Sequence, residues 1–395
     1  MGQLKRRLGF WLLTSYGVGT TLGAGIYVLV GEIAGVAGYY APLSFLLAGL
    51  LAFPSGLAFA ELSARYPKSA GPAVFVSTAF KTPHLALVVG LLVAASGVVS
   101  SATLLNGMVG YLNNFIQIKP WLTIVTTLII LSLICIWGIK ESIGLAAFIT
   151  AIEAGALILI AGLGADLVDF DTVITASPSI PFSALGLISG GLIAFYAFIG
   201  FEDIASVAEE VIDVKRNIPK AIIATLIITC LLYICVSFTA VFAVGPKALS
   251  EQSAPLAYVF SKATAINDTL ISLIAILAII NGVLIQIVMA SRILYGMAEE
   301  RWVPSILGEV NAKRGTPVNA TILVTIAVAV FALLLPLVRL AQITSSLILI
   351  IFFIINLALW RIKMTDPDFS GFQIPKWVLI WGMSGAAFLI FANIL

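Results

Sequence analysis

The residues best placed to do chemistry in this sequence are three glycines that interrupt an apolar segment, residues 10–37. Gly19, Gly23 and Gly25 lie in the run Gly-Thr-Thr-Leu-Gly-Ala-Gly-Ile-Tyr. A glycine costs a helix interior about 1 kcal/mol relative to alanine, so this run favours an opened backbone. Opened backbone at membrane depth is tolerated only where it is buried in protein or lines a wet cavity. The run therefore predicts a broken helix at a binding site.

A second apolar segment, residues 184–207, combines a glycine with acidic side chains. Gly200 is followed closely by Glu202 and Asp203. Two carboxylates well inside an apolar run are costly unless the backbone is open and the site is wet. The alternative reading of such glycines is close packing between helices, as in small-xxx-small interfaces. Because two segments are interrupted and one of them also carries acids, we favour two broken helices.

A single carboxylate occupies a third apolar segment, residues 143–163. Glu153 lies near the middle of this segment, with no other charged residue inside it. An isolated acid in such surroundings should be buried, paired or protonated. Glu153 is therefore a candidate for proton or ion chemistry.

The cysteines and the histidine give little support for a metal site or a catalytic nucleophile. The three cysteines, Cys135, Cys230 and Cys235, fall in apolar segments and show no metal-ligand spacing with His84, the single histidine. We predict buried free thiols and no metal site. His84 is expected in a loop, without a nucleophile beside it, so we predict that the protein is not an enzyme.

The elements that must position these residues are membrane helices. Of the 395 residues, 61% are hydrophobic and only 10% are charged, whereas a soluble domain carries about 25% charged residues. The partner expected of such a chain is the lipid bilayer. A formal net charge of +2 and the lack of a basic cluster argue against a nucleic-acid partner. The first apolar segment has no small-residue cleavage site, so we expect a retained span.

Hydropathy predicts eleven transmembrane spans. Seventeen of the 21 Lys and Arg residues fall on one side of this arrangement. The positive-inside rule then places the N-terminus in the cytoplasm and the C-terminus outside. The predicted spans are 10–37, 42–64, 85–112, 122–137, 143–163, 184–207, 221–244, 265–297, 318–338, 343–360 and 377–394.

The two interrupted spans are the first and the sixth, which are five spans apart. Five is odd, so the second unit would begin on the opposite side of the membrane from the first. This offset predicts a five-plus-five inverted repeat within one all-α domain, residues 1–395. The first repeat would cover 10–163 and the second 184–360, with an additional span at 377–394. Secondary transporters have this arrangement.

Four motifs stand in order along the first ten spans. They are Gly23-Ala24-Gly25-Ile26-Tyr27; Glu61-Leu62-Ser63-Ala64-Arg65-Tyr66-Pro67 with Ala70-Gly71-Pro72; Phe198-Ile199-Gly200-Phe201-Glu202 with Ala208-Glu209-Glu210 and Arg216-Asn217-Ile218-Pro219; and Ser291-Arg292-Ile293-Leu294-Tyr295-Gly296-Met297-Ala298 with Pro304 and Gly315-Thr316-Pro317. Their order and spacing resemble those of the amino acid–polyamine–organocation (APC) superfamily. The resemblance implies a LeuT-type fold with spans 1 and 6 discontinuous, and transport without a cofactor. Members usually have twelve spans, one more than we predict here.

The resemblance also implies a substrate site at the two breaks. In the family, backbone amides at the break in the first span hold the substrate's carboxylate, which agrees with anion binding at a helix N-terminus. Backbone carbonyls at the break in the sixth span hold its ammonium group. Tyr196 falls where relatives often place an aromatic residue that closes over the substrate, although it could equally be a packed aromatic residue. The implied site residues are Thr21, Gly23, Ala24 and Gly25 for the carboxylate, Phe195, Tyr196 and Ile199 for the ammonium group, and Glu202 beside them.

Two carboxylates are candidates for proton coupling. Glu202 either titrates during transport or bridges the broken halves of its span by hydrogen bonding. Several sodium-independent relatives have a lysine where this chain has Glu153, so the sequence departs from the family pattern there. We favour Glu153 as the proton carrier. The alternatives are that Glu153 helps to bind Na⁺ or that it hydrogen-bonds the backbone at the first break.

Together these residues predict a secondary active transporter of amino acids in the plasma or inner membrane. It would work by alternating access, as a proton-coupled symporter or an exchanger. The residues expected to line the substrate site are largely apolar and aromatic, which favours neutral amino acids as substrates. The alternatives are a polyamine, amine or cationic amino acid carrier and, in a different class, a non-transporting amino acid sensor. A polyamine carrier would require several acids in the cavity.

Overall fold

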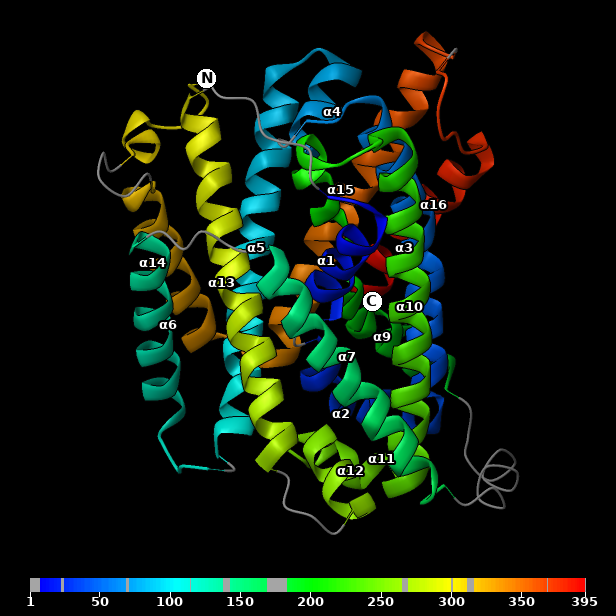
Figure 1. The fold of residues 1–395 in the computed structure, drawn as a ribbon, viewed down its shortest axis with the longest axis vertical. Helices are drawn as coiled ribbons and strands as arrows, with labels where there is room; N and C mark the ends of the chain where they lie inside the picture. The colour runs from blue at the N-terminus through cyan, green and yellow to red at the C-terminus, as the bar shows by residue number, and fades with distance from the viewer. Residues whose placement is uncertain are drawn as a thin grey trace.

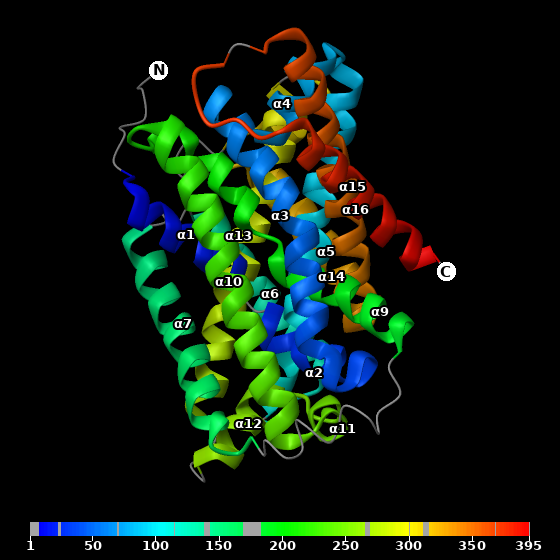
Figure 2. The ribbon, with the colours of Figure 1, turned by 90° about the vertical axis from the view of Figure 1, so that its right-hand side faces the viewer.

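The chain folds into a bundle of helices whose long axes run mostly along one direction (Figures 1 and 2). The computed structural model describes residues 8–22, 25–68, 71–113, 115–137, 143–168, 183–264, 269–299, 301–310, 316–367 and 369–394. Across these ranges the elements are helices, apart from one parallel β-bridge between Leu8 and Val211. This bridge joins the residues just before the first predicted span to those just after the sixth.

Seven α-helices and one 3₁₀ turn are found among the described residues in the first half of the chain. They are α1 (Phe10–Leu22), α2 (Gly25–Ala37), η1 (Gly38–Tyr40), α3 (Ala41–Arg65), α4 (Gly71–Phe80), α5 (Pro83–Asn113), α6 (Pro120–Trp137) and α7 (Ile143–Ala165). Gly38 has φ +61°, a left-handed conformation that glycine adopts without steric cost. This residue lets the chain turn from α2 into α3.

Three further 3₁₀ segments occur in the described part of the second half of the chain. Its elements are α9 (Ala184–Phe195), η2 (Tyr196–Phe198), η3 (Phe201–Glu210), α10 (Val214–Val244), α11 (Pro246–Ser250), α12 (Pro255–Thr264), α13 (Thr269–Glu299), η4 (Ser305–Gly308), α14 (Val318–Leu334), α15 (Leu337–Thr365) and α16 (Lys376–Ile394). The short helices α11 and α12 lie between the seventh and eighth predicted spans.

Each of the eleven predicted spans overlaps at least one of these helices, and the sixth overlaps α9, η2 and η3. Seven helical stretches among the described residues are long and apolar enough to cross a membrane, and α6, α14 and α16 are shorter apolar helices. The sequence did not predict α4, which lies at one end of the bundle with the segment that joins α15 to α16 (Figure 2). α11 and α12 lie at the opposite end (Figure 1).

Apolar side chains cover the outside of the bundle as well as its core. Leu133 on α6, Ile326 on α14 and Leu231 on α10 are each more than half exposed. An aqueous surface does not expose so many apolar helical side chains, whereas a hydrocarbon environment favours them. The chain is therefore a multi-pass membrane protein.

An aromatic cluster fills the core where α3, α15 and the sixth predicted span meet. The ring of Phe352 on α15 lies 5.6 Å from Phe59 on α3, 5.9 Å from Phe195 and 5.3 Å from Phe201. Tilted and edge-on pairs at these separations favour the aromatic quadrupoles. The cluster fixes the position of the residues on both sides of η2.

Candidate functional site

The sixth predicted span changes conformation at Phe195. α9 ends there, Tyr196–Phe198 form one 3₁₀ turn, and Ile199 is extended with ψ 133°. Gly200 then has φ 129°, a conformation that side chains rarely adopt. The chain continues as η3, so the α-helical hydrogen-bond ladder does not run through this stretch.

The first predicted span is described as two helices, α1 ending at Leu22 and α2 beginning at Gly25. The predicted carboxylate contacts at Gly23 and Ala24 lie outside the described residues. Gly25 itself faces η2, because a Cβ added to it would lie 2.8 Å from the Cα of Ala197. Only a residue without a side chain permits this approach of two backbones.

A second close approach joins the end of α1 to the turn after η2. A Cβ added to Gly200 would lie 2.9 Å from the backbone nitrogen of Thr21. The hydroxyl of Thr20 donates to the carbonyl oxygen of Gly200 at 2.9 Å. The ends of α1 and α2 therefore both contact the segment Ala197–Gly200.

Tyr233 on α10 connects these two segments. Its side chain is fully buried. Its hydroxyl lies 2.7 Å from the carbonyl oxygen of Thr21 and 2.8 Å from that of Ala197, so its one proton can be donated to either. Sequence reasoning missed this residue, because a tyrosine inside an apolar helix carries no signal that separates it from an ordinary packed aromatic residue.

The residues whose carbonyls were predicted to bind the ammonium group pack within the protein. The ring of Phe195 packs in the aromatic cluster. The Tyr196 ring is buried, and its hydroxyl hydrogen-bonds Ser100 on α5, with 3.0 Å to the side-chain oxygen and 3.2 Å to the carbonyl. Ile199 is partly buried, and its N–H donates to the carbonyl of Tyr196 at 3.2 Å. In this conformation Tyr196 is a packed, hydrogen-bonded residue.

Two other predicted site residues form local hydrogen bonds. The Thr21 hydroxyl donates back to the carbonyl of Gly17 at 2.8 Å, within its own helix. The carboxylate of Glu202 accepts a hydrogen bond from the N–H of Gly200 at 2.9 Å. Glu202 thus holds the turn that separates η2 from η3.

Glu153 is the least satisfied polar side chain near these segments. It is 1% exposed, and neither carboxylate oxygen has a hydrogen-bond partner among the described residues. The helix that carries it, α7, packs against α1 and α10. The Tyr27 hydroxyl donates to the backbone carbonyl of Glu153 at 3.0 Å. An unpartnered buried carboxylate is costly, so its position beside α2 and α10 calls for a functional explanation.

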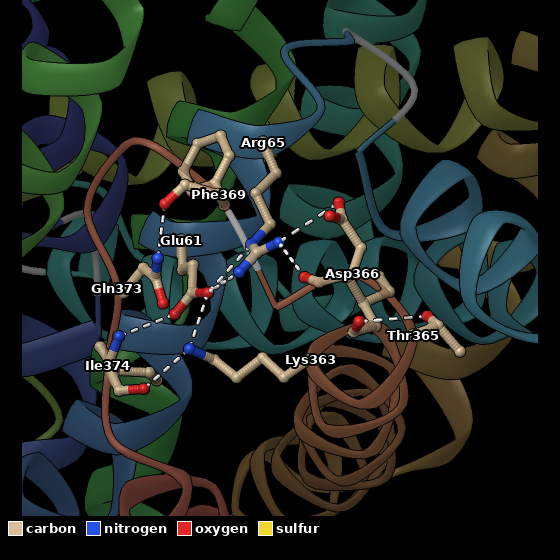
Figure 3. Close-up of polar contacts among 9 residues, drawn as sticks. Glu61, Arg65, Lys363, Thr365, Asp366, Phe369, Gln373 and Ile374 are labelled. Carbon is tan, nitrogen blue, oxygen red and sulfur yellow. Dashed lines mark hydrogen bonds and ion pairs between the residues drawn. The ribbon is translucent and has the colours of Figure 1, made fainter.

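A separate polar network lies where α3 and α15 end (Figure 3). Glu61 is fully buried and accepts hydrogen bonds from Arg65 at 2.8 Å and 3.0 Å, and it forms an ion pair with Lys363 at 2.8 Å. Its second oxygen accepts from the N–H of Ile374 at 2.8 Å. The sequence motif that contains Glu61 and Arg65 indicated a family resemblance, but it gave no sign of Lys363.

The prediction of three buried thiols is confirmed in full for Cys135 alone and is wrong for Cys235. Cys135 is buried and Cys230 is half-buried, whereas Cys235 is exposed on α10. Lipid-facing and core-facing positions of a membrane helix are both apolar, so a small apolar residue such as cysteine does not reveal which way it points.

The chain is similar in sequence to known amino acid permeases and transporters. The model of the family described as amino acid permease matches residues 8–395. A cationic amino acid transporter of Arabidopsis thaliana, named as mitochondrial, is 31% identical over 390 residues, which cover 92% of this chain and 63% of that protein. The chain therefore spans less than two thirds of this relative's length. A branched-chain amino acid permease of Bacillus subtilis is 25% identical, covering 97% of this chain and 86% of that protein.

A solved structure confirms the predicted fold class. A Na⁺-coupled sialic acid symporter, in a substrate-bound, outward-open state, aligns with 98% of this chain and 90% of its own, with a TM-score of 0.62 and 13% sequence identity. At this identity the likeness shows the fold alone. The all-helical LeuT-type architecture is confirmed, while the number of membrane crossings and the repeat boundaries stay predictions.

Proposed function

Because the chain belongs to the amino acid permease family of the APC superfamily, we propose that it carries amino acids across a membrane by alternating access. The observation that carries the proposal is the approach of the ends of α1 and α2 to η2. Gly25 lies against Ala197, and the Tyr233 hydroxyl is within hydrogen-bond distance of the carbonyls of Thr21 and Ala197. The N-terminus of α2 would offer amides to a carboxylate. The carbonyls near the C-terminal end of α9 would accept from an ammonium group.

The substrate residues we propose are those implied by the sequence. Gly25 would donate its amide together with Gly23 and Ala24, and Thr21 would contribute backbone rather than hydroxyl because its hydroxyl already donates to Gly17. The ammonium group would meet carbonyls of the segment from Phe195 to Ile199. Glu202 would hold the turn beside them, a structural role rather than a titrating one.

We propose neutral amino acids as the substrate class. The side chains around the junction are mainly apolar and aromatic, among them Tyr27, Phe195 and Phe198, and a relative is named as a branched-chain amino acid permease. Cationic amino acids are the second candidate. Relatives named as cationic amino acid transporters and the unpartnered carboxylate of Glu153, which could pair with a cationic side chain, favour them.

We propose that transport is coupled to protons through Glu153. Its carboxylate is buried without a hydrogen-bond partner among the described residues, so uptake and release of a proton would alter the local charge strongly. Na⁺ is the alternative coupling ion, because carboxylate and carbonyl oxygens suit hard cations. Replacing Na⁺ by choline during uptake separates the two.

Reconstitution into proteoliposomes tests the proposed function. We expect saturable uptake of a neutral amino acid such as leucine, competed by other neutral amino acids and not by isoamylamine, which lacks the carboxylate. Competition by lysine with equal potency would favour the cationic substrate class. Competition by isoamylamine or cadaverine would favour an amine carrier, and binding without uptake would favour a sensor.

We also propose a plasma or inner membrane location with the N-terminus in the cytoplasm, as the distribution of Lys and Arg predicts. The test uses a variant whose three cysteines are replaced by serine. A membrane-impermeant thiol reagent should label Lys262→Cys in intact cells and Lys376→Cys only after lysis. The reverse pattern would invert the topology.

A further inference from the structure

A pocket of about 470 Å³ lies outside the site described above, at the N-terminal end of α10. It is formed between the first turns of α10 and the segment that joins α15 to α16. Both elements lie at the end of the bundle where α4 is found (Figure 2). The residues that line it are Lys215, Arg216, Pro219, Lys220, Ile223, Gly371 and Phe372.

Three cations line this pocket. Lys215, Arg216 and Lys220 are exposed, and among the described side chains none of them forms an ion pair with an acid. The ammonium group of Lys215 lies 5.2 Å from the centre of the Phe369 ring and 3.5 Å from the carbonyl oxygen of Ser370. Neither of these two contacts carries a negative charge, so the three positive charges seen among the described residues favour an anion in the pocket.

Below the cations, the same face of α10 becomes apolar. Ile223, Ile227 and Leu231 follow Lys220 at spacings of three and four residues, which places them in one row along the helix. Ile227 is 47% exposed and Leu231 is 58% exposed. With a rise of about 1.5 Å per residue, Lys220 and Leu231 are roughly 16 Å apart along the axis. One leaflet of a bilayer has a hydrocarbon depth of about 15 Å.

We propose that this surface binds one anionic phospholipid, with its phosphate held by Lys215, Arg216 and Lys220 and an acyl chain lying along Ile223, Ile227 and Leu231. The charged pocket and the apolar row match the two parts of such a molecule in order and in length. A soluble phosphate compound would use the cations alone and leave the apolar row without a role. Basic pockets between membrane helices are suited to lipid headgroups for the same reason.

A bound lipid would also brace two parts of the bundle. The segment that lines one wall of the pocket is already fixed to α3 and α15, because Glu61 accepts from the N–H of Ile374 and Lys363 donates to its carbonyl. A phosphate between this segment and α10 would join α10 to the same network. The lipid is therefore expected to raise the stability of the folded protein.

The test measures lipid binding by the purified full-length chain in detergent. Dioleoylphosphatidylglycerol is titrated while the unfolding midpoint is recorded, and bound lipid is counted by native mass spectrometry. Dioleoylphosphatidylcholine and inorganic phosphate are the comparison ligands. A ligand that binds only the folded state raises the midpoint, so we expect a shift with phosphatidylglycerol that is larger than with either comparison ligand.

Two sets of variants locate the site. The variant Lys215→Gln/Arg216→Gln/Lys220→Gln should need about a hundredfold more phosphatidylglycerol for half-saturation, since each basic residue near a membrane surface contributes roughly a factor of five. The matched control Arg292→Gln/Arg361→Gln/Lys376→Gln removes the same charge outside the pocket and should bind as the unaltered chain does. Lys215→Arg/Lys220→Arg should retain binding.

Several outcomes would overturn the proposal. Unchanged binding by the triple pocket variant would remove the pocket as the site, and equal loss in the control would indicate non-specific charge attraction. An equal response to inorganic phosphate would assign the pocket to a soluble anion. If the triple variant does not fold, Lys220→Gln alone should weaken binding about fivefold. None of these measurements depends on transport, so their failure leaves the proposed function untouched.

Discussion

The hydroxyl of Tyr233 lies 2.7 Å from the carbonyl oxygen of Thr21, in the last turn of α1. The same hydroxyl lies 2.8 Å from the carbonyl oxygen of Ala197 in η2. Both carbonyls belong to segments where a helix ends inside the bundle, so each has lost or weakened its helical partner. A fully buried phenol that serves both carbonyls holds α1 and η2 at a fixed separation, which is the separation that a substrate between them would meet.

We predict that Tyr233→Phe impairs transport more than it impairs folding. One buried carbonyl loses its donor, which costs about 1–3 kcal/mol, and the distance between α1 and η2 is no longer fixed. In proteoliposomes the Michaelis constant for the amino acid should rise several-fold, while the unfolding midpoint falls by a few degrees. Tyr258→Phe on α12 is the control. Unchanged uptake by Tyr233→Phe would mean that the hydroxyl does not set the site geometry.

We predict that Gly25→Ala nearly abolishes uptake. The added Cβ would lie 2.8 Å from the Cα of Ala197, so one backbone must move, at an overpacking cost of about 1–3 kcal/mol. The displacement falls at the proposed substrate contact. Gly155→Ala on α7 is a matched control, because a Cβ there meets no atom within 4 Å and alanine favours the helix. Normal uptake by Gly25→Ala with a normal unfolding midpoint would contradict the tight contact.

Glu153→Gln tests proton coupling. The amide cannot bind and release a proton at physiological pH, so uptake driven by an imposed pH gradient should fall to background. Exchange of internal for external amino acid, which needs no net proton movement, should persist. Glu251→Gln, at an exposed position after α11, removes a carboxylate outside the bundle core and should leave both activities intact. Undiminished pH-driven uptake by Glu153→Gln would eliminate the proton-carrier role.

The sequence predicted the fold, and it suggested where the site lies, because both signals are local. Glycines in the first span and the acids that follow Gly200 are visible as exceptions within apolar segments, and their offset of five spans points to the repeat. Tyr233 gave no such signal. Its role depends on the fold bringing its hydroxyl to the carbonyls of Thr21 and Ala197, which are 212 and 36 residues away in the sequence.

Lys363 and Cys235 likewise gave no signal in the sequence of where their side chains lie. In the sequence Lys363 is indistinguishable from the other basic residues at the ends of spans. It meets Glu61, on another helix, only in the folded protein. Cys235 was predicted to be buried, yet it points outward from α10. In a membrane helix both faces are apolar, so the pattern that distinguishes inside from outside in a soluble helix is missing.

The network around Glu61 supports the last prediction, which concerns stability. Glu61→Gln leaves Arg65 and Lys363, both largely buried, without their shared anion, and removing one partner of a buried ion pair costs about 3–5 kcal/mol. The unfolding midpoint should fall accordingly. Asp366→Asn is the control, because Asp366 is 62% exposed and 3.7 Å from Arg65, and such surface pairs contribute about 0–1 kcal/mol.

In the double variant Glu61→Gln/Lys363→Gln the loss of stability should be smaller than the sum of the two single losses, since neither charge is then left unpaired by the other's removal. Strictly additive losses would show that Glu61 and Lys363 stabilise the bundle independently, and the ion pair would not be what fastens α15 to α3.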